Sequence, residues 1–444
     1  MIPILRPLAA GWSVRRSNLF RGVLANCSAR VLAILGLAAA TIAVARVGGP
    51  ADVGAYALLR MLPGLVGVLC VGGLPGALGY FLSQPRRGTA HLWPTLFTIL
   101  AGGSLLGSLV WWAVTPQLAR TFFPGDSTTS IGWAGATVAT QLLLTVGKTS
   151  LQGLGDRRGG DIVIAAEELA FLPCYALAMV AGVAAVPSLV IGLAAADLAV
   201  AGFAWRRVTR HTGWRPGCGV ARPDRALARE VLTYGMRGQV GGMITLLNLR
   251  LDFAILGAMA GPAVLGSYAV ASKYAELLRL PGTALTWVTY PLLAGMPAES
   301  ATRQARRLVL PAGLVTALGA APFVLLAGPV IGLLYGDRFD AAVLPAQVLV
   351  FGMLLGGAAG VASGYLYGRG HPGLNSWAFG VGLAFTVLLD VLLIPRYGVM
   401  GAAFASTTAY LLTDAALLVM LRRAGGHTAE ELREVPTPPE RVRT

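Results

Sequence analysis

Two closely matching stretches, GPADVGAYA at residues 49–57 and GPAVLGSYA at residues 261–269, decide the organisation of this chain. Each stretch follows a long apolar run and opens the next one, so the two mark the same place in successive halves. A weaker echo relates LGDRR at 154–158 to YGRG at 367–370. A Gly-Pro pair is also a common turn, but the matched positions favour an internal repeat.

The composition is typical of a membrane protein. Hydrophobic residues make up 55% of the 444 positions and charged residues only 12%, about half of the ~25% usual in soluble domains. A soluble core cannot bury this much apolar surface, so an ordinary soluble enzyme, a disordered chain and a secreted disulfide scaffold are excluded. The cysteines have no metal-ligand or disulfide spacing and are interpreted as apolar fillers. They are Cys27, Cys70, Cys174 and Cys218.

Apolar runs bounded by Pro, Gly and Arg predict twelve transmembrane helices, since about 20 apolar residues cross a bilayer. Strand alternation is absent, and in lipid only helices or closed barrels satisfy their own backbone. The expected fold class is therefore an all-α polytopic membrane protein. Interruptions are expected in the second span at Pro63, Gly72, Gly73 and Pro75, and in the eighth at Pro281, Gly282 and Pro291. The expected spans are 22–45, 55–82, 91–114, 131–152, 162–184, 188–205, 231–258, 263–293, 308–335, 343–367, 373–394 and 398–421.

Each half holds six spans, and because six is an even number the halves run in the same sense across the membrane. This is the parallel type of transporter repeat, for which a substrate site between the halves is expected. The expected organisation is a cytoplasmic segment at 1–21, a first lobe at 22–205, a cytoplasmic linker at 206–230, a second lobe at 231–421 and a tail, expected to be disordered, at 422–444.

The arginines predict the orientation. With the N-terminus in the cytoplasm, roughly twenty arginines fall on the inner side, and only Arg46, Arg120, Arg338 and Arg396 lie on outer loops, as the positive-inside rule requires. Both termini are therefore expected in the cytoplasm, and the protein in the inner cell membrane. The net charge of +15 is attributed to these loops, so no nucleic-acid partner is expected.

Four stretches carry a resemblance to a known family. They are RVGGPADVGAY at 46–56, Asp252 followed by GPAVLGSYAVA at 261–271, YGDRF at 335–339 and LLIPRYGVMGAA at 392–403. In order and spacing they resemble the polysaccharide-transporter, Wzx-type branch of the MOP (MATE-like) superfamily. The resemblance implies two six-helix lobes around a central cavity lined mainly by helices 1, 2, 7 and 8. It also implies alternating access and an oligosaccharide on a polyprenyl pyrophosphate as cargo.

Positive side chains inside the spans are the candidate ligands for this cargo. A charge at bilayer depth costs at least ~2.5–3.5 kcal/mol, so it marks either a transport pathway or an ion pair. Guanidinium groups bind phosphate oxygens bidentately, and a ladder of cations along a water-filled cavity would let a pyrophosphate cross. The alternative is that the cations pair with Asp252 and Glu276 and only hold the helices together. The predicted substrate-binding residues are Arg30, Arg60, Arg250, Lys273 and Arg279.

Carboxylates inside the spans are candidates for coupling transport to protons or sodium ions, although such groups are more often paired or interfacial. They are Glu167, Glu168, Asp197, Asp252 and Asp390. No cofactor or metal is expected. The stretch GKT at 147–149 resembles the end of a phosphate-binding loop, but Leu142 occupies the place of its first glycine. The chain is therefore expected to be a transporter and not an enzyme.

Three functions fit these features. The favoured one is a flippase that moves a polyprenyl-pyrophosphate-linked oligosaccharide from the inner to the outer leaflet for cell-surface polysaccharide synthesis. Its expected partners are membrane lipids and glycosyltransferases or a polysaccharide polymerase. A MATE-like small-molecule or cation antiporter is the alternative, and it predicts a cavity dominated by carboxylates. A non-transporting scaffold would need no charges in the bilayer interior.

Overall fold

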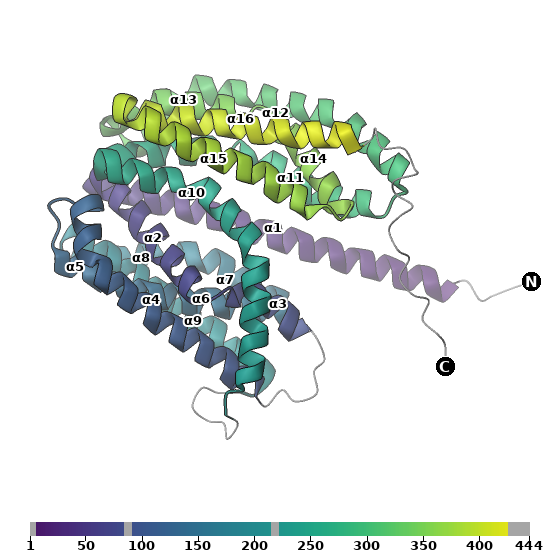
Figure 1. The fold of residues 1–444 in the computed structure, drawn as a ribbon, viewed down its shortest axis with the longest axis horizontal. Helices are drawn as coiled ribbons and strands as arrows, with labels where there is room; N and C mark the ends of the chain where they lie inside the picture. Colours follow the sequence, from purple (N-terminus) through teal and green to yellow (C-terminus); the bar gives the residue numbers. More distant parts are fainter. Residues whose placement is uncertain (1–5, 84–90, 215–221, 425–444) are drawn as a thin grey trace, which may run out of the picture. The chain divides into compact units, whose positions relative to one another are not determined.

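The structure is a computed structural model that describes residues 6–83, 91–214 and 222–424 (Figure 1). Over these residues every regular element is a helix, which confirms the expected fold class. The chain divides into two compact units, Met1–Gly242 with Gly257–Gly266, and Met243–Leu256 with Ser267–Thr444. Residues 425–444 of the expected tail lie outside the described residues.

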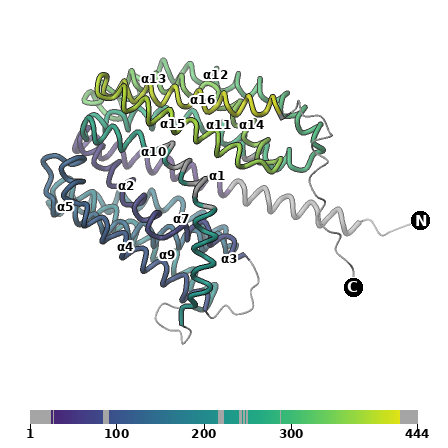
Figure 2. Tube along the Cα trace, in the orientation of Figure 1, coloured from purple at the N-terminus to yellow at the C-terminus, as the bar shows by residue number. Residues whose placement is uncertain are grey.

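The elements follow the expected apolar runs, and Figure 2 traces their order along the chain. In the first unit the described helices are α1 (Arg6–Gly48), α2 (Pro50–Cys70), α3 (Leu74–Ser83), α4 (Leu92–Phe122), α5 (Thr128–Trp133), α6 (Gly135–Gly153), α7 (Arg157–Leu169), α8 (Phe171–Val180) and α9 (Ala185–Thr212). Helix α10 (Arg225–Glu276) contributes to both units.

The second unit continues from α10 with elements that include one 3₁₀ helix, η1. These are α11 (Arg279–Ala294), α12 (Ala298–Tyr335), η1 (Asp337–Ala342), α13 (Val343–Gly352), α14 (Gly356–Gly368), α15 (Pro372–Tyr397) and α16 (Val399–Ala424). Helices α15 and α16 pack along each other, as do α11 and α14.

Nine of the described helices are long and apolar enough to cross a membrane. A tenth crossing is counted when Asp337–Gly352 and Gly356–Gly368, which meet at a bend of 45°, are taken as one span. The other expected spans are helical as well, but they are broken or more polar. Helices α5 and α6 cover 131–152, and α10 and α11 cover 231–293, where Arg250–Glu276 is already among the nine. Helix therefore occupies all twelve expected runs.

The repeated stretches form the same turn twice. Gly49 has φ 88° and ψ −164°, and Gly261 has φ 83° and ψ 172°. This conformation is essentially restricted to glycine. In each case the following proline starts a new helical segment, because its fixed φ suits the first turn of a helix and its missing N–H is not needed there. The repeat predicted from the sequence is thus also a structural repeat.

The two copies also meet each other inside the first unit, to which Gly257–Gly266 belongs. A Cβ added to Gly54 would collide with the carbonyl oxygen of Pro262, and a Cβ added to Gly266 would collide with the carbonyl oxygen of Pro50. Each glycine is the fourth residue after its own proline, so the contact is reciprocal. We call these four residues the glycine–proline clasp.

The interruption expected in the second span lies at Gly72 and Gly73, whose φ angles are 61° and 78°. Pro63 and Pro291 do not interrupt their spans, since each lies inside a continuous helix. The interruption in the eighth span falls just before the expected position, between Glu276 and Arg279. Pro281 therefore lies in the first turn of α11, where a proline is tolerated, and it helps to start that helix instead of kinking it.

Asp156 fastens the beginning of α7 to the end of α9. Its carboxylate accepts hydrogen bonds from Gly159 N at 2.9 Å, from Arg207 Nε at 2.7 Å and Nη2 at 3.0 Å, and contacts His211 Nε2 at 2.9 Å. Burial favours the neutral acid, but these hydrogen bonds outweigh burial and lower the pKa of Asp156 to about 2. The contacts fix α7 and α9 relative to each other within the first unit.

The clasp predicts that a single methyl group is harmful at either glycine. Gly54→Ala and Gly266→Ala should each lower the free energy of unfolding by about 1–3 kcal/mol, because backbone must move to accommodate the new Cβ. Thermal unfolding of the purified protein in detergent measures the change. Gly102→Ala on α4 is the matched control, since nothing lies within 4 Å of its Cβ position. Equal stability of the Gly54→Ala and Gly102→Ala proteins would contradict the clasp.

The Asp156 contacts predict a defined acid sensitivity. The pKa of this group is about 2 in the folded protein and 3.8 ordinarily, so its stabilisation is complete above pH 4 and is lost as pH falls from 4 towards 2. Asp156→Asn should cost roughly 2 kcal/mol at pH 7 and flatten the stability profile between pH 4 and 2. Unfolding experiments across this range test it, with the exposed Asp340→Asn as control. An unchanged profile in Asp156→Asn would assign the acid transition to another group.

Candidate functional site

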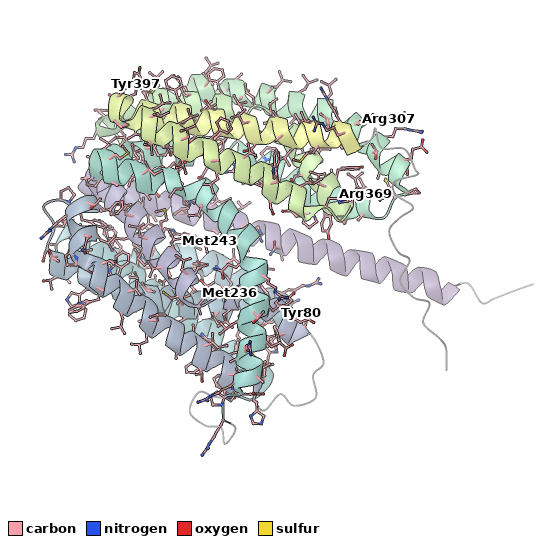
Figure 3. The ribbon with its side chains drawn as sticks, viewed as in Figure 1. Tyr80, Met236, Met243, Arg307, Arg369 and Tyr397 are labelled. Carbon is pink, nitrogen blue, oxygen red and sulfur yellow. The ribbon has the colours of Figure 1, made fainter. Side chains whose placement is uncertain are left out.

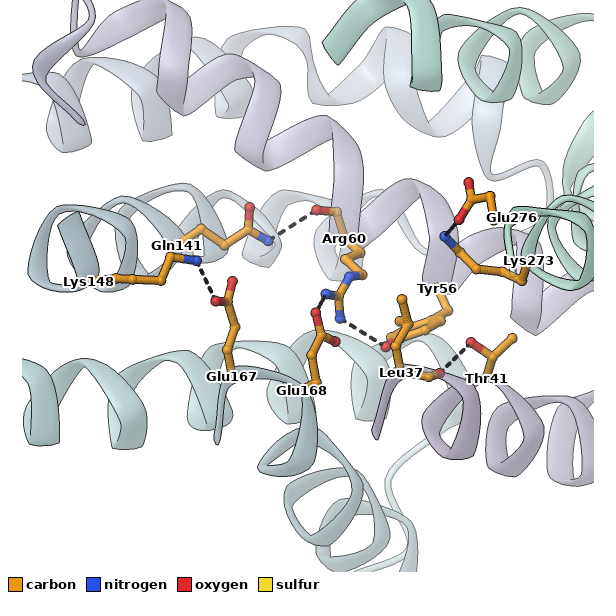
Figure 4. Close-up of polar contacts among 10 residues, drawn as sticks. All are labelled: Leu37, Thr41, Tyr56, Arg60, Gln141, Lys148, Glu167, Glu168, Lys273 and Glu276. Atoms are coloured by element: carbon orange, nitrogen blue, oxygen red, sulfur yellow. Dashed lines mark hydrogen bonds and ion pairs between the residues drawn. The ribbon is translucent and has the colours of Figure 1, made fainter. Parts of the chain in front are cut away.

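A cluster of charged side chains from three helices lies within the first unit (Figure 4). Arg60 on α2 forms an ion pair with Glu168 on α7 and donates a hydrogen bond from Nη1 to the Tyr56 hydroxyl at 3.3 Å. Lys148 on α6 pairs with Glu167 on α7, with 2.5 Å between Nζ and Oε2. Two adjacent glutamates of one helix therefore neutralise cations from two other helices.

The sequence explains how adjacent glutamates reach different partners. Successive residues of a helix are separated by ~100° around its axis, so Glu167 and Glu168 point towards α6 and α2 respectively. Each pair removes an isolated charge from a membrane helix, where such a charge is costly. The pairing of Glu168 is incomplete, because its buried Oε2 has no hydrogen-bond partner among the described residues.

Asp197 on α9 adds a third carboxylate beside these pairs. It is buried and accepts a hydrogen bond from Thr140 Oγ1 at 3.0 Å. A cavity of about 110 Å³ is lined by polar residues and by Leu144, Phe171, Leu193 and Ala196, the polar ones being Arg60, Gln141, Thr145, Glu167 and Asp197. This volume lies far below the ~300 Å³ at which small-molecule pockets begin, and it suits an ion with a few water molecules.

Arg30 on α1 differs from Arg60 because it has no carboxylate partner. Its exposed guanidinium donates from Nε to Asn26 Oδ1 at 2.9 Å, and Asn26 Nδ2 in turn donates to Asp161 Oδ1 at 2.6 Å. Within the described part of the chain Arg30 forms no ion pair. The amide of Asn26 orients the guanidinium without neutralising its charge.

In the second unit, Glu276 is the centre of the charged cluster. Lys273 Nζ lies 2.8 Å from Glu276 Oε2, and Arg250 Nη1 lies 3.7 Å from Glu276 Oε1. One carboxylate therefore serves two of the predicted substrate-binding cations. The alternative interpretation, in which these cations pair with acids, describes Glu276 correctly.

Asp252 is not paired with a cation, as that alternative interpretation would require, because its hydrogen-bond partners are neutral groups. The Tyr268 hydroxyl donates to Asp252 Oδ2 at 2.6 Å, and the backbone N–H of Phe253 donates to Oδ1 at 2.8 Å. The Ser406 hydroxyl of α16 lies 2.9 Å from the Tyr268 hydroxyl. Asp252 is only 1% exposed, so this small network replaces the water that a carboxylate would otherwise bind.

Asp390 on α15 is the most isolated acid among the described residues. It is 0% exposed, and neither carboxyl oxygen has a hydrogen-bond partner in the described part of the chain. An unpartnered charge is very unfavourable in such surroundings. Asp390 is therefore stable there when it carries a proton or holds a cation, which is the chemistry that ion coupling requires.

Arg279 is the first residue of α11, and its guanidinium lies over the ring of Tyr410 on α16, with 5.7 Å from Cζ to the ring centroid. A cation–π contact of this kind orients a guanidinium, and the carboxylates of Glu276 and Asp414 lie within electrostatic range of it. Like Arg30, Arg279 takes part in no ion pair between described residues.

The predicted substrate-binding cations thus form two groups. Arg60, Arg250 and Lys273 are paired with glutamates, whereas Arg30 and Arg279 are not. That all five line one substrate path remains a prediction, as does the role of each carboxylate in coupling.

Sequence reasoning missed the tyrosines that hold these groups. Tyr56 contacts Arg60 in the first unit, and Tyr268 contacts Asp252 in the second. A signal existed, because each tyrosine is the eighth residue of its copy of the repeated stretch. Thr140 and Ser406 carry no comparable signal, since single hydroxyl residues are common in membrane helices.

Comparison with known proteins gives a consistent result. A family model described as polysaccharide biosynthesis protein matches residues 43–344. The chain is 25% identical over 191 residues to a Haloferax volcanii protein named probable flippase AglR, which covers 41% of this chain and 40% of that protein. The curated relatives are matched over only 38–41% of their own length.

Two solved structures share the fold. The inward closed conformation of lipid II flippase MurJ aligns with a TM-score of 0.71 and 12% identity, over 91% of this chain and 87% of that one. An inward-facing multidrug resistance MATE family transporter of the MOP superfamily aligns with a TM-score of 0.68 and 14% identity, over 93% of this chain and 99% of that one. At these identities the likeness establishes the fold.

The Arg60–Glu168 pair predicts strong coupling between its members. Arg60→Met should lower the free energy of unfolding by about 3 kcal/mol, because Glu168 is left without a cation. Arg60→Met combined with Glu168→Leu should recover most of that loss. Thermal unfolding of the two single variants and the double variant gives the coupling energy. The exposed pair Arg303–Glu299 is the control, with coupling near zero. Strict additivity at Arg60 and Glu168 would disprove the prediction.

Proposed function

Because this chain belongs to the polysaccharide biosynthesis protein family, we propose that it is a flippase for a lipid-linked oligosaccharide in cell-surface polysaccharide synthesis. The family membership confirms the resemblance read from the sequence, and the fold shared with MurJ and MATE structures agrees with it. The observation that supports the proposal most is that two guanidinium groups on helices of a multi-pass membrane protein, those of Arg30 and Arg279, form no ion pair with a described residue.

The chemistry of the cargo explains why such groups are useful. A polyprenyl pyrophosphate joins an apolar chain to a head group with at least two negative charges and a sugar. The chain can stay in lipid while the head group crosses, provided that fixed donors replace its water. Guanidinium groups bind phosphate oxygens through two parallel hydrogen bonds and keep their charge at any physiological pH, so Arg30 and Arg279 are the residues assigned to the pyrophosphate.

The paired cations take a second role in this proposal. Arg60, Arg250 and Lys273 already have glutamate partners, so the cargo must compete with Glu168 and Glu276 for them. A phosphate that displaces a glutamate exchanges one ion pair for another and creates no unpaired cation. The displaced glutamate then loses its cation, so these three residues are weaker ligands for the pyrophosphate than Arg30 and Arg279.

Ion coupling is assigned to the acids that lack a cationic partner. Asp390 is buried without hydrogen bonds from described residues, and Asp197 lines a cavity of ion-like size. Asp252 is hydrogen-bonded to Tyr268 and Ser406. Glu167 and Glu168, the other candidates, are held in ion pairs. A proton or a sodium ion is the proposed coupling ion.

The proposed location is the inner cell membrane with both termini in the cytoplasm, and the arginine distribution supports it. Alternating access between the two leaflets is the proposed mechanism, and the proposed partners are glycosyltransferases or a polysaccharide polymerase. These enzymes would supply and consume the lipid-linked sugar on opposite sides of the membrane.

A second candidate function is small-molecule or cation antiport. The buried acids Asp252 and Asp390 favour it, since a cationic substrate needs carboxylates, and the MATE structure shares the fold. The two functions make opposite demands on Arg30 and Arg279, because these arginines would repel a cation and attract a pyrophosphate.

Loss of either of these arginines should therefore abolish flipping. Arg30→Ala and Arg279→Ala should each lower the initial rate by at least tenfold, since a hydrogen bond to a charged group contributes about 1.5–3 kcal/mol. The assay uses proteoliposomes containing a fluorescent polyprenyl-pyrophosphate sugar and a membrane-impermeant quencher. Arg206→Ala, an exposed arginine outside both clusters, is the matched control and should leave the rate unchanged.

Two further readouts separate the candidate functions. The arginine variants should insert into the membrane and unfold at the wild-type temperature, so that a loss of rate is a loss of transport. Wild-type flipping that persists in both arginine variants would refute the assignment of the pyrophosphate. Counterflow of a cationic dye, undiminished in Arg30→Ala and Arg279→Ala, would favour the antiporter.

A further inference from the structure

A separate pocket lies between α12 and α16 in the second unit. It has a volume of about 390 Å³ and is lined by Arg306, Val309, Leu418, Leu421 and Arg422. The volume is within the ~300–1,000 Å³ range of small-molecule pockets. None of the residues assigned to flipping or to ion coupling lines it. We call it the α12–α16 pocket.

One wall of the α12–α16 pocket is strongly positive. Arg306 and Arg422 are exposed, and Arg306 Nη2 donates a hydrogen bond to the backbone carbonyl of Arg422 at 2.8 Å. Arg307, labelled in Figure 3 at this end of α12, and Arg423 are exposed beside them. Among the described residues none of these four arginines forms an ion pair, in contrast to Arg303 of the same helix, which pairs with Glu299.

The rest of the α12–α16 pocket is apolar and lies next to the positive wall along each helix. Val309 follows Arg306 by three residues and Leu418 precedes Arg422 by four, which corresponds to about 4.5–6 Å along a helix axis. Leu421 is buried in the core of this unit, and Val309 and Leu418 pack against that core. Both helices thus place an arginine at the end of an apolar run at the same level.

This combination selects the chemical class of the occupant. Two uncompensated guanidinium groups suit a phosphate, and an apolar wall one helical turn deeper suits a hydrocarbon chain. A free phosphate would gain nothing from Val309 and Leu418, and a neutral lipid would gain nothing from Arg306 and Arg422. Basic pockets between transmembrane helices at the cytoplasmic surface are suited to anionic phospholipids. In the orientation predicted from the arginines, this end of α12 and α16 lies at that surface.

We propose that the α12–α16 pocket binds an anionic phospholipid of the bilayer, with its phosphate on Arg306 and Arg422 and an acyl chain along Val309 and Leu418. The lipid is a resident ligand and not the transported cargo, because the pocket shares no residue with the cation clusters. The proposal does not rest on the flippase assignment, and its test reads lipid binding instead of transport.

The test is native mass spectrometry of the purified full-length protein, titrated with phosphatidylglycerol, cardiolipin or phosphatidylcholine. The wild type should retain the two anionic lipids and release phosphatidylcholine. Arg306→Ala and Arg422→Ala should each weaken anionic-lipid binding about fivefold, since one basic residue near an anionic membrane contributes about 1 kcal/mol. Arg303→Ala is the matched control and should bind as the wild type does.

Two variants keep the test informative if an alanine variant unfolds. Arg306→Lys retains the charge and should bind within about twofold of the wild type. Leu418→Trp should fill the apolar part of the α12–α16 pocket and reduce binding of diacyl lipid by at least fivefold, while thermal unfolding in lipid-free detergent reports on the fold. Together they separate the contribution of charge from that of the acyl chain.

Several results would overturn the proposal. Equal retention of phosphatidylglycerol by wild type and by Arg306→Ala/Arg422→Ala would do so, as would displacement by glycerol 3-phosphate at matched concentration, which would mean that a soluble phosphate suffices. Displacement by polyprenyl pyrophosphate in preference to phosphatidylglycerol would identify cargo. Binding seen only after removal of residues 425–444, which contain Glu430 and Glu431, would identify the chain's own acidic segment as the occupant.

Discussion

The cost of a charge among hydrocarbon chains is the constraint on which this structure depends. Glu167 and Glu168 on one helix meet Lys148 and Arg60 on two others, and each contact removes an isolated charge that would cost at least ~2.5 kcal/mol. These contacts also determine which helices are neighbours, because a long polar side chain has few places to go inside a bilayer. In the first unit the ion pairs and the packing of the helices therefore determine each other.

Groups that escape this rule carry the functional information. A membrane protein can bury a structural ion pair anywhere, so Lys148 and Glu167 need no ligand to explain them. Arg30, Arg279 and Asp390 are different, since none of them forms an ion pair with another described residue. Two of them favour an anion and one favours a proton or a cation. In the proposed function, different residues therefore serve cargo and coupling, whereas counting charges in the sequence treats them alike.

The sequence was sufficient for the helices and their turns. The stretches that indicate the family all contain a glycine with positive φ, namely Gly49, Gly261, Gly336 and Gly398. Such residues are readable from sequence because their conformation excludes most side chains. The twelve apolar runs were likewise readable, since the bilayer imposes a fixed length on them. Their interruptions were less readable, because the one before Arg279 shifted from the predicted place and the bend between Gly352 and Gly356 was not predicted.

The partners of the charged residues were beyond the sequence. Arg60 and Glu168 are separated by 108 positions, and nothing local in either helix indicates the other. In the sequence Arg60 and Arg30 look alike, because each is the single cation of an apolar span. In the structure Arg60 forms an ion pair and Arg30 does not. Asp252 illustrates the reverse case, because a hydroxyl network with Tyr268 and Ser406 takes the place of an expected cation.

The glycine–proline clasp bears on the history of this chain. In each copy of the repeat, the proline carbonyl lies against the glycine of the other copy. A larger residue at either glycine would collide with the other copy, so natural selection acts on the two copies together. Two identical half-length chains related by a twofold axis would make both contacts with a single glycine and a single proline, as any isologous interface does. The clasp is what gene duplication and fusion of such a homodimer would leave behind.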